Sequence, residues 1–216
     1  MIRLYDYVLS ASCYKVRLMA ALVGVTLERE AVDFHPGRAH KSVAFRQMNP
    51  AGTLPVLVAG ELILTESTAM LVYLARTAGP EWLGPDTVPA MAQVQQWLAF
   101  SGRLAASLGM ARLHDMLIYS GDIEALRRDG HLALRELEAG LTERRIVGAL
   151  WLVGAGPTIA DIACFPNVML SQDGGVSLDA YPSVRLWTRA IRSLDRFVEM
   201  PGIHRLHERK PAPMVV

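Results

Sequence analysis

Two serines and a cysteine, Ser10, Ser12 and Cys13, stand just ahead of an apolar run with helical spacing in the segment VLSASCYKVRLMAAL. We expect all three at or just before a helix N-terminus, where partial positive charge favours a thiolate. The sulfur could belong to Cys13 or to a ligand whose thiol receives a hydrogen bond from a hydroxyl. The structural alternative is that Ser12 only caps the helix and Cys13 is a small apolar residue in its first turn.

A second candidate pair, Glu66 and Ser67, lies between a strand-like and a helix-like segment. Ser67 is expected to cap the helix, whose free backbone amides would attract an anionic group. A carboxylate on those amides and an ammonium group beside Glu66 would together hold an amino-acid zwitterion. The alternative is a plain helix cap with an acidic neighbour that suits the helix dipole.

Pro55 and the basic pair His40 and Lys41 are the remaining candidates in the first third of the chain. A proline that opens a strand, in GTLPVL, is tolerated at a sheet edge, and a cis bond there would leave the Leu54 backbone open to an extended peptide. A trans proline ending a loop is the commoner arrangement. His40 and Lys41 fall in a polar loop, where they either pair with a second carboxylate or are simply solvated.

The pattern around these residues predicts a small α/β unit. It reads as a strand over residues 2–8, a helix from Ser12 to the stop at Gly24, a strand over 26–34, a hairpin formed by PVLVA and ELIL, and a helix over STAMLVYLART. The segment AGPEWLGPDTVP, with three prolines and two glycines, then interrupts regular structure.

Helical periodicity dominates the rest of the chain. We expect two long antiparallel helices hinged near residues 119–122, a helix opened by a capping box of Thr158 and Asp161, and a last helix from Pro182 to Ser193. These elements predict a domain at 1–79, a linker at 80–89 and an all-helical domain at 90–216, with a loosely held tail in ERKPAPMVV.

Composition limits the classes of function. The 216 residues are 51% hydrophobic and 20% charged, with a formal net charge of +1. This balance suits a soluble globular protein and gives no long-range field for nucleic acid or a membrane surface. No apolar window reaches spanning length and MIRLYDYVLS is too short for a signal peptide, so we expect a cytoplasmic protein. The two cysteines are expected to be reduced, and the six histidines show no metal-ligand spacing.

Together these motifs resemble the cytosolic glutathione transferases over nearly the whole chain. NPAGTLPVL matches the cis-proline loop of that family, LTESTAMLVYLAR its Glu-Ser motif and PTIADIACF its helix-capping signature. SASCYKVRLMAAL is similar to the serine and cysteine variants, including the zeta-class SSCxxxVR pattern and many bacterial members, although Ala11 stands where zeta members usually have a second serine. The resemblance implies an α/β thioredoxin-like N-terminal domain followed by an all-α helical bundle.

The resemblance also implies roles for individual residues. Pro55 would be cis, Leu54 would pair with the backbone of the glutathione cysteine, and the Glu-Ser motif would hold the γ-glutamyl end. Ser10 aligns with the catalytic serine or cysteine of the family, with Ser12 as the alternative and Cys13 as a neighbouring thiol. The residues implied for glutathione binding are His40, Lys41, Thr53, Leu54, Pro55, Glu66 and Ser67.

The implied chemistry is attack of a glutathione thiolate on a small hydrophobic electrophile held between the domains. The first helix of the second domain would supply the wall of this pocket, although such a stripe often belongs to a core; the candidates are Leu104, Leu108, Met110, Arg112 and Leu113. Glutathione is then a co-substrate, no metal is expected, and the family analogy suggests a homodimer. A glutathione-dependent isomerase, a disulfide-bond reductase and a non-catalytic interaction module remain alternatives.

Overall fold

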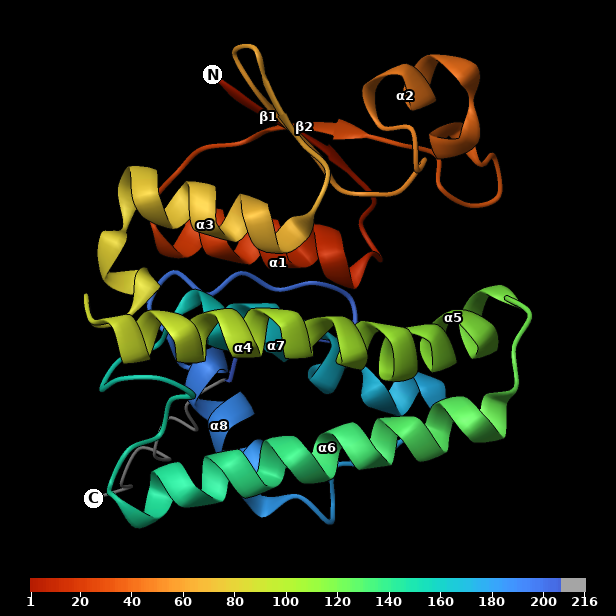
Figure 1. The fold of residues 1–216 in the computed structure, drawn as a ribbon. Coiled ribbons are helices and arrows are strands. Elements are labelled where there is room, and N and C mark those ends of the chain that lie inside the picture. The colour runs from red at the N-terminus through yellow and green to blue at the C-terminus, as the bar shows by residue number, and fades with distance from the viewer. Residues whose placement is uncertain (207–216) are drawn as a thin grey trace, which may run out of the picture.

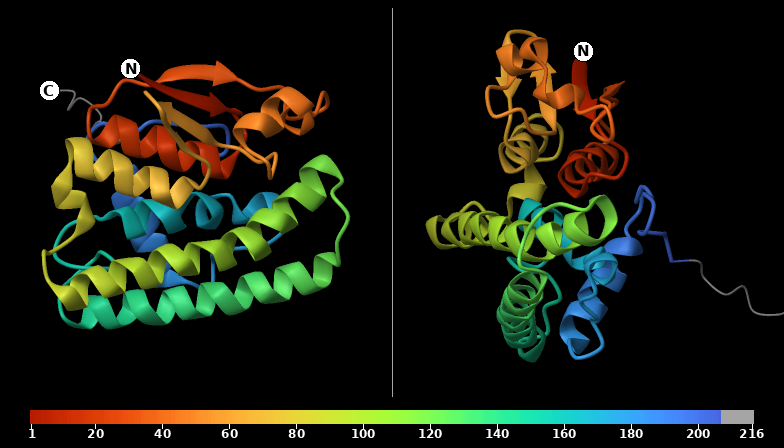
Figure 2. Two further views of the ribbon diagram at one scale, coloured as in Figure 1. Left: turned by 45° about the horizontal axis from the view of Figure 1, so that its top comes forward. Right: turned by 90° about the vertical axis from the view of Figure 1, so that its right-hand side faces the viewer.

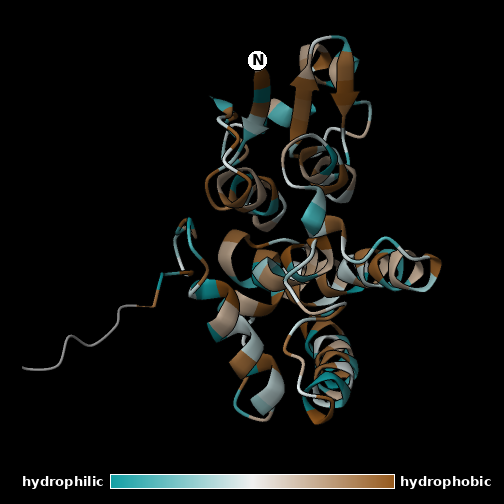
Figure 3. Ribbon diagram, turned by 90° about the vertical axis from the view of Figure 1, so that its left-hand side faces the viewer, coloured by the Kyte–Doolittle hydropathy of each residue, from teal (hydrophilic) through white to brown (hydrophobic). Residues whose placement is uncertain are grey.

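The computed structural model describes residues 1–206 and begins with a four-stranded mixed sheet of order β2-β1-β3-β4. The first strand, β1 (Ile2–Asp6), pairs in parallel with β2 (Glu28–Ala31) and antiparallel with β3 (Val56–Ala59). A tight turn leads from β3 into the antiparallel β4 (Leu62–Leu64). The predicted hairpin is therefore confirmed. Figure 3 shows that its strands are mainly hydrophobic, whereas the outer helices carry both hydrophobic and hydrophilic residues.

Two helices cover one face of this sheet. They are α1 (Ala11–Leu22) and α3 (Ser67–Ala78), which run side by side beneath the strands in Figure 1. A short 3-10 turn (Ala39–Lys41) and α2 (Val43–Met48) lie at the far end of the sheet. The N-termini of α1 and α3 lie at the same end of the helical layer, so their partial positive charges point to one region.

The rest of the described chain is helical. After a 3-10 turn (Pro80–Leu83), α4 (Val88–Leu104) passes through a π-helical segment (Ala105–Gly109) into α5 (Met110–Leu117), and α6 (Ile123–Ile146) returns antiparallel to them. The remaining elements are α7 (Ile159–Met169), a 3-10 turn (Ser171–Gly174) and α8 (Pro182–Arg192). This arrangement confirms the predicted fold class, a thioredoxin-like N-terminal domain followed by a helical bundle.

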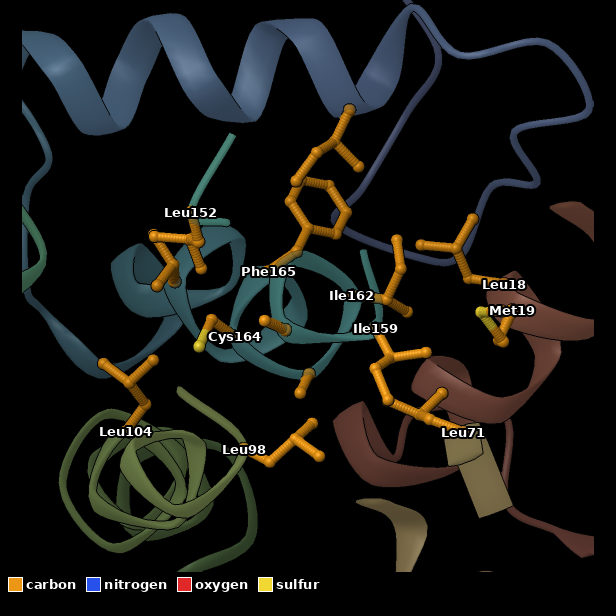
Figure 4. Packing of buried hydrophobic residues seen from close by; sticks show 14 of the residues in the cluster. Leu18, Met19, Leu71, Leu98, Leu104, Leu152, Ile159, Ile162, Cys164 and Phe165 are labelled. Carbon is orange, nitrogen blue, oxygen red and sulfur yellow. The ribbon is translucent and has the colours of Figure 1, made fainter. Parts of the chain in front are cut away.

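Helix α7 forms the centre of the molecule, and it packs against α1 and α3 on one side and α4 on the other. Figure 4 shows Leu71 of the first domain beside Ile159 of α7 and Leu18 beside Ile162, and all four side chains are buried. Each such side chain contributes about 1.5–3 kcal/mol when it leaves water. The two parts of the chain thus share one continuous core, which fixes the relative position of the surfaces on either side of it.

The start of α7 is organised by the predicted capping box. Asp161 Oδ2 accepts a hydrogen bond from the Thr158 amide at 2.8 Å, and Thr158 Oγ1 accepts one from the Ala160 amide at 3.2 Å. The same buried carboxylate also accepts a bond from Trp187 Nε1 of α8 at 2.8 Å. The box therefore joins two helices as well as capping one.

The predicted domain limits, 1–79, 80–89 and 90–216, remain a prediction. The tail ERKPAPMVV, for which loose attachment was predicted, lies outside the described residues. Among residues 1–206 no helix combines the length and the apolar character that crossing a membrane requires.

Candidate active site

The helix α4, the π-helical segment and α5 form one continuous stretch over residues 88–117, which we call the α4–α5 arm. A cleft of about 730 Å³ opens between the N-terminal domain and this arm. One wall comes from the loop before α1, the segment around residues 34–41 and the loop before β3. The opposite wall comes from the π-helical segment, α5 and the residues that follow it, while Asn167 of α7 lies between them. Both Ser10 and Ser12 line the cleft, so the structure brings the two candidate hydroxyls to the same space.

Ser10, not Ser12, caps α1. Its Oγ accepts a hydrogen bond from the Cys13 amide at 3.2 Å, and its own amide donates to the Tyr7 carbonyl at 2.9 Å. The prediction that Ser12 is the cap is wrong because the turn closed by Tyr7 starts the helix two residues earlier. The cap bond uses Ser10 Oγ as an acceptor, which leaves its hydroxyl proton available to a sulfur atom.

Cys13 does not face the cleft. Its side chain is fully buried, and its Sγ accepts a hydrogen bond from the Tyr7 amide at 3.5 Å. Burial raises the pKa of the thiol to about 12. The expectation that the helix terminus acidifies this thiol is therefore wrong, because desolvation of the thiolate outweighs the helix charge. A reactive thiolate at this site must come from a ligand.

The loop before Ser10 is held from the first domain by Arg17, which sequence reasoning did not identify as a site residue. Arg17 forms an ion pair with buried Asp6 and donates from Nη2 to the Val8 carbonyl at 2.9 Å. Asp6 also pairs with Arg29 at 2.8 Å. The signal available in the sequence was the arginine in YKVR, about two helical turns after Ser10.

The Leu54–Pro55 bond is cis, as the resemblance implies. Asn49 Nδ2 fixes the preceding residue by donating to the Thr53 carbonyl at 2.9 Å and to Thr53 Oγ1 at 3.0 Å. Within residues 1–206 the backbone of Leu54 forms no hydrogen bond, and Leu54 and Thr53 both line the cleft. The cleft therefore presents an open main-chain edge of the kind that pairs with an extended peptide.

His40 and Lys41 also line the cleft. Lys41 Nζ donates to the carbonyls of Ala51 and Gly52, at 3.1 and 2.6 Å, and so joins the basic loop to the loop before β3. His40 is buried and stacks on Phe34 with ring centroids 4.2 Å apart, and its Nδ1 has no partner among residues 1–206. Burial, reinforced by Lys41 and other nearby cations, lowers the pKa of His40.

The lining of the cleft is cationic. Arg38, Lys41 and Arg112 contribute to it, and none of its described residues is an aspartate or glutamate. Such a lining attracts a small anionic ligand.

Glu66 and Ser67 lie at the N-terminus of α3, outside the cleft lining but at the same end of the helical layer as Ser10. Glu66 is the N-cap residue and Ser67 the first helical residue, because the Met70 amide donates to the Glu66 carbonyl at 3.1 Å. The prediction that Ser67 caps the helix is therefore wrong. No side chain caps α3, so the amides of its first turn are free to donate hydrogen bonds to an anion.

The predicted apolar wall divides into two groups. Met110, Arg112 and Leu113 line the cleft, whereas Leu104 and Leu108 are buried in the core and do not line it. Figure 4 shows Leu104 reaching from α4 toward α7. The prediction for these two leucines is wrong because Leu104 and Leu108, four residues apart, share a helix face that packs in the core, whereas Met110 and Leu113 point to another side.

A thioredoxin-like domain with an open main-chain edge, joined to helices that complete a cationic cleft, defines a class of proteins that can bind a small anionic peptide. Residues 1–76 match the family model described as "Glutathione S-transferase, N-terminal domain". The chain is 38% identical over 203 residues to glutathione S-transferase theta-1 of Bos taurus, covering 89% of this chain and 82% of the relative. The chain belongs to the glutathione S-transferase family.

Two further comparisons describe the range of its relatives. The maleylacetoacetate isomerase of Pseudomonas aeruginosa is 31% identical over 189 residues, which cover 85% of this chain and 87% of the relative. The crystal structure of a glutathione S-transferase from Pseudomonas fluorescens Pf-5 superposes with a TM-score of 0.83 at 30% identity, covering 92% of this chain and 98% of that one. The resemblance recognised from the motifs is thus confirmed at the level of the family.

Proposed function

We propose that the protein is a glutathione transferase that activates the glutathione thiol beside Ser10 for attack on a small hydrophobic electrophile. The observation that carries the proposal is the arrangement of the cleft, in which a cap hydroxyl at a helix N-terminus faces a cationic lining without acidic residues. Glutathione has two carboxylates and one ammonium group, so this lining favours its net negative charge.

Three elements would hold the peptide. The open backbone of Leu54 would pair with the central cysteine residue of glutathione, and the free amides at the start of α3, with Glu66 beside them, would take the γ-glutamyl end. The basic loop with His40 and Lys41 would face the glycine carboxylate. This orientation places the thiol near the start of α1.

The chemical step then follows from the position of the thiol. The Ser10 hydroxyl donates to the sulfur and the helix dipole stabilises its negative charge, so the thiol proton passes to water. The thiolate then forms a carbon–sulfur bond while the bond from that carbon to its leaving group breaks, and the leaving group departs with the electron pair. Lowering a thiol pKa by about two units corresponds to roughly 2.7 kcal/mol, which one charge-assisted hydrogen bond and a helix terminus can supply. Glutathione is consumed as a co-substrate, and the electrophile lies against the apolar residues Met110 and Leu113.

A glutathione-dependent isomerase is the second candidate. It is favoured by the Pseudomonas aeruginosa relative named maleylacetoacetate isomerase. An isomerase uses the same thiolate, which adds to a carbon–carbon double bond, allows rotation about the resulting single bond and is expelled when the double bond forms again. Disulfide exchange through Cys13 is disfavoured because the thiol is buried and its pKa is about 12.

The assembly and the cellular compartment are further proposals. We infer a homodimer because apolar side chains are exposed on α3 and α4, with Val72 at 36% and Met91 at 58% exposure. Light scattering of the purified protein tests this. A cytoplasmic location is supported by the two free cysteines, Cys13 and Cys164.

The decisive experiment is a titration of the protein with glutathione at several pH values, following the ultraviolet absorbance of the thiolate. The proposal expects a bound thiolate near neutral pH that is lost in Ser10→Ala while glutathione still binds. Absence of glutathione binding would contradict the catalytic proposal and favour the interaction module. A thiolate that persists in Ser10→Ala but disappears in Ser12→Ala would move the activating role to Ser12.

A further inference from the structure

Arg112 of α5 connects the second domain to the backbone that carries Ser10. We propose that Arg112 is a positioning residue for thiol activation, and this inference rests on the proposed transferase or isomerase function. Arg112 Nη1 donates to the Leu9 carbonyl at 2.7 Å, across 103 positions of the chain. Leu9 immediately precedes Ser10, so the bond acts on the residue next to the candidate hydroxyl.

The guanidinium is itself fixed. Its Nε donates to Asp173 Oδ2 at 2.9 Å, and the Arg112 residue is only 6% exposed. The turn that carries Asp173 packs closely on α5, because a Cβ atom at Gly174 would lie 2.7 Å from the Arg112 amide nitrogen. A side chain at Gly174 would push this turn away, so the approach that places Asp173 beside Arg112 requires a glycine.

Two arginines therefore hold the loop before Ser10, one from each domain. Arg17 of α1, paired with Asp6, takes the Val8 carbonyl at 2.9 Å, and Arg112 takes the next carbonyl. Among residues 1–206 the Leu9 carbonyl has no other hydrogen-bond partner. Arg112 is thus the link through which the position of α5 can affect the direction of the Ser10 hydroxyl.

Arg112 also contributes charge to the cleft, because it is one of the residues that line it. Asp173 is its acidic partner, and the other ionisable groups of the lining lie on the opposite wall or beyond α5: Tyr7, His35, Arg38, His40, Lys41 and Tyr119. A buried cation that faces a developing thiolate favours its ionised form. Loss of Arg112 is expected to weaken thiol ionisation through both the loop and the charge.

The proposed peptide contacts, at Leu54, Lys41 and the start of α3, do not involve Arg112. Its loss should therefore change the ionisation of bound glutathione much more than its affinity. A residue that only stabilised the fold would change both, together with the melting temperature.

The test compares Arg112→Gln, Arg112→Lys and Asp173→Asn with the control Arg103→Gln. Arg103 is a matched arginine of the same arm whose ion pair with Glu136 is about half exposed, with side-chain exposures of 57% and 48%. Each variant is characterised by the pKa of bound glutathione from thiolate absorbance, its dissociation constant from calorimetry, and kcat with an excess of electrophile.

For Arg112→Gln we expect the pKa of bound glutathione to rise by about one unit and kcat near pH 6.5 to fall about tenfold, with affinity within about twofold of the natural protein. Arg112→Lys should show a smaller rise in this pKa, because its ammonium keeps the charge but cannot donate to the Leu9 carbonyl and to Asp173 with the geometry of a planar guanidinium. Asp173→Asn, which keeps the arginine, should show a smaller rise, and Arg103→Gln none.

The inference is overturned if the thiolate titration of Arg112→Gln matches that of the natural protein. It is also overturned if thiolate pKa, affinity and melting temperature all change in proportion in both Arg112→Gln and Asp173→Asn. If Arg112→Gln does not fold, the titrations of Arg112→Lys and Asp173→Asn decide, and unchanged values in both reject the proposal. A natural protein that binds glutathione without forming a thiolate rejects the proposed function, and this inference with it.

Discussion

The two walls of the cleft are built on different principles. The N-terminal wall is fixed by hydrogen bonds, such as those of Asn49 to Thr53 and of Lys41 to Gly52, and it offers backbone groups and positive charge. The opposite wall offers apolar side chains, among them Met110 and Leu113, which follow a π-helical segment. A wall made from main-chain groups depends on the fold, whereas a wall made from side chains changes with each substitution. The first suits a constant substrate and the second a variable one.

The sharpest test of this contrast is Ser10→Ala. We expect kcat/KM to fall about 100-fold, the equivalent of about two pKa units, while glutathione affinity changes less than about threefold because the peptide contacts remain. Steady-state kinetics and calorimetry measure the two quantities. Ser12→Ala and Cys13→Ala are the controls, and a comparable loss in either would disprove the assignment to Ser10.

The apolar wall is tested by Leu113→Ala. Removing most of this side chain should raise the KM for a hydrophobic electrophile about tenfold, since about 1.5 kcal/mol of apolar contact is lost, and leave glutathione affinity unchanged. Leu104→Ala is the matched control, because Leu104 is fully buried in the core. That variant should instead lose about 2–5 kcal/mol of folding free energy in a denaturant titration. An electrophile KM that responds equally to both variants would contradict the division of this wall.

Lys41→Met examines the cationic wall. The substitution removes a positive charge and the bonds to the Ala51 and Gly52 carbonyls, so we expect the dissociation constant of glutathione to rise about fivefold and its salt dependence to weaken. Calorimetry at two ionic strengths measures both. Lys41→Arg keeps the charge and should lose less. Equal affinity in all three proteins would remove Lys41 from the binding site.

The smallest expected effect is the pH dependence that His40 gives to the N-terminal wall. The pKa of His40 is lowered in the folded protein, so below about pH 6.5 the unfolded chain binds more protons than the folded one. The free energy of unfolding therefore decreases, and the protein becomes less stable, as the pH drops toward the folded pKa. Above pH 6.5 this contribution is constant. Melting temperatures of the natural protein and of His40→Asn between pH 7.5 and 5.5 measure it. A steeper decline in the variant would reverse the assigned sign.

The sequence predicted the elements well because their signals are local. The alternation in PVLVA and ELIL, the box of Thr158 and Asp161, and the proline that opens α8 each act within one turn or one strand. Of the residues predicted to bind glutathione, His40, Lys41, Thr53 and Leu54 line the cleft, whereas Pro55, Glu66 and Ser67 do not, and the binding role of all seven stays a prediction.

The errors arose where the outcome depended on competition or on distant contacts. Ser10 and Ser12 are both good caps, and only the turn at Tyr7 decides between them. Cys13 has the helix position of a reactive thiol, but its desolvation comes from the core packed around it. Leu104 and Leu108 share one helix face, and only the elements packed around that helix decide that this face meets the core and not the cleft.

The absence of acidic side chains from the described lining of the cleft has a consequence for the end of the reaction. A glutathione conjugate keeps both carboxylates of the free peptide, so the wall that captures the substrate also retains the product. We therefore expect departure of the conjugate, rather than formation of the carbon–sulfur bond, to limit turnover with reactive electrophiles. Salt screens the attraction, so moderate ionic strength should speed turnover at saturating glutathione while it weakens capture at low concentration.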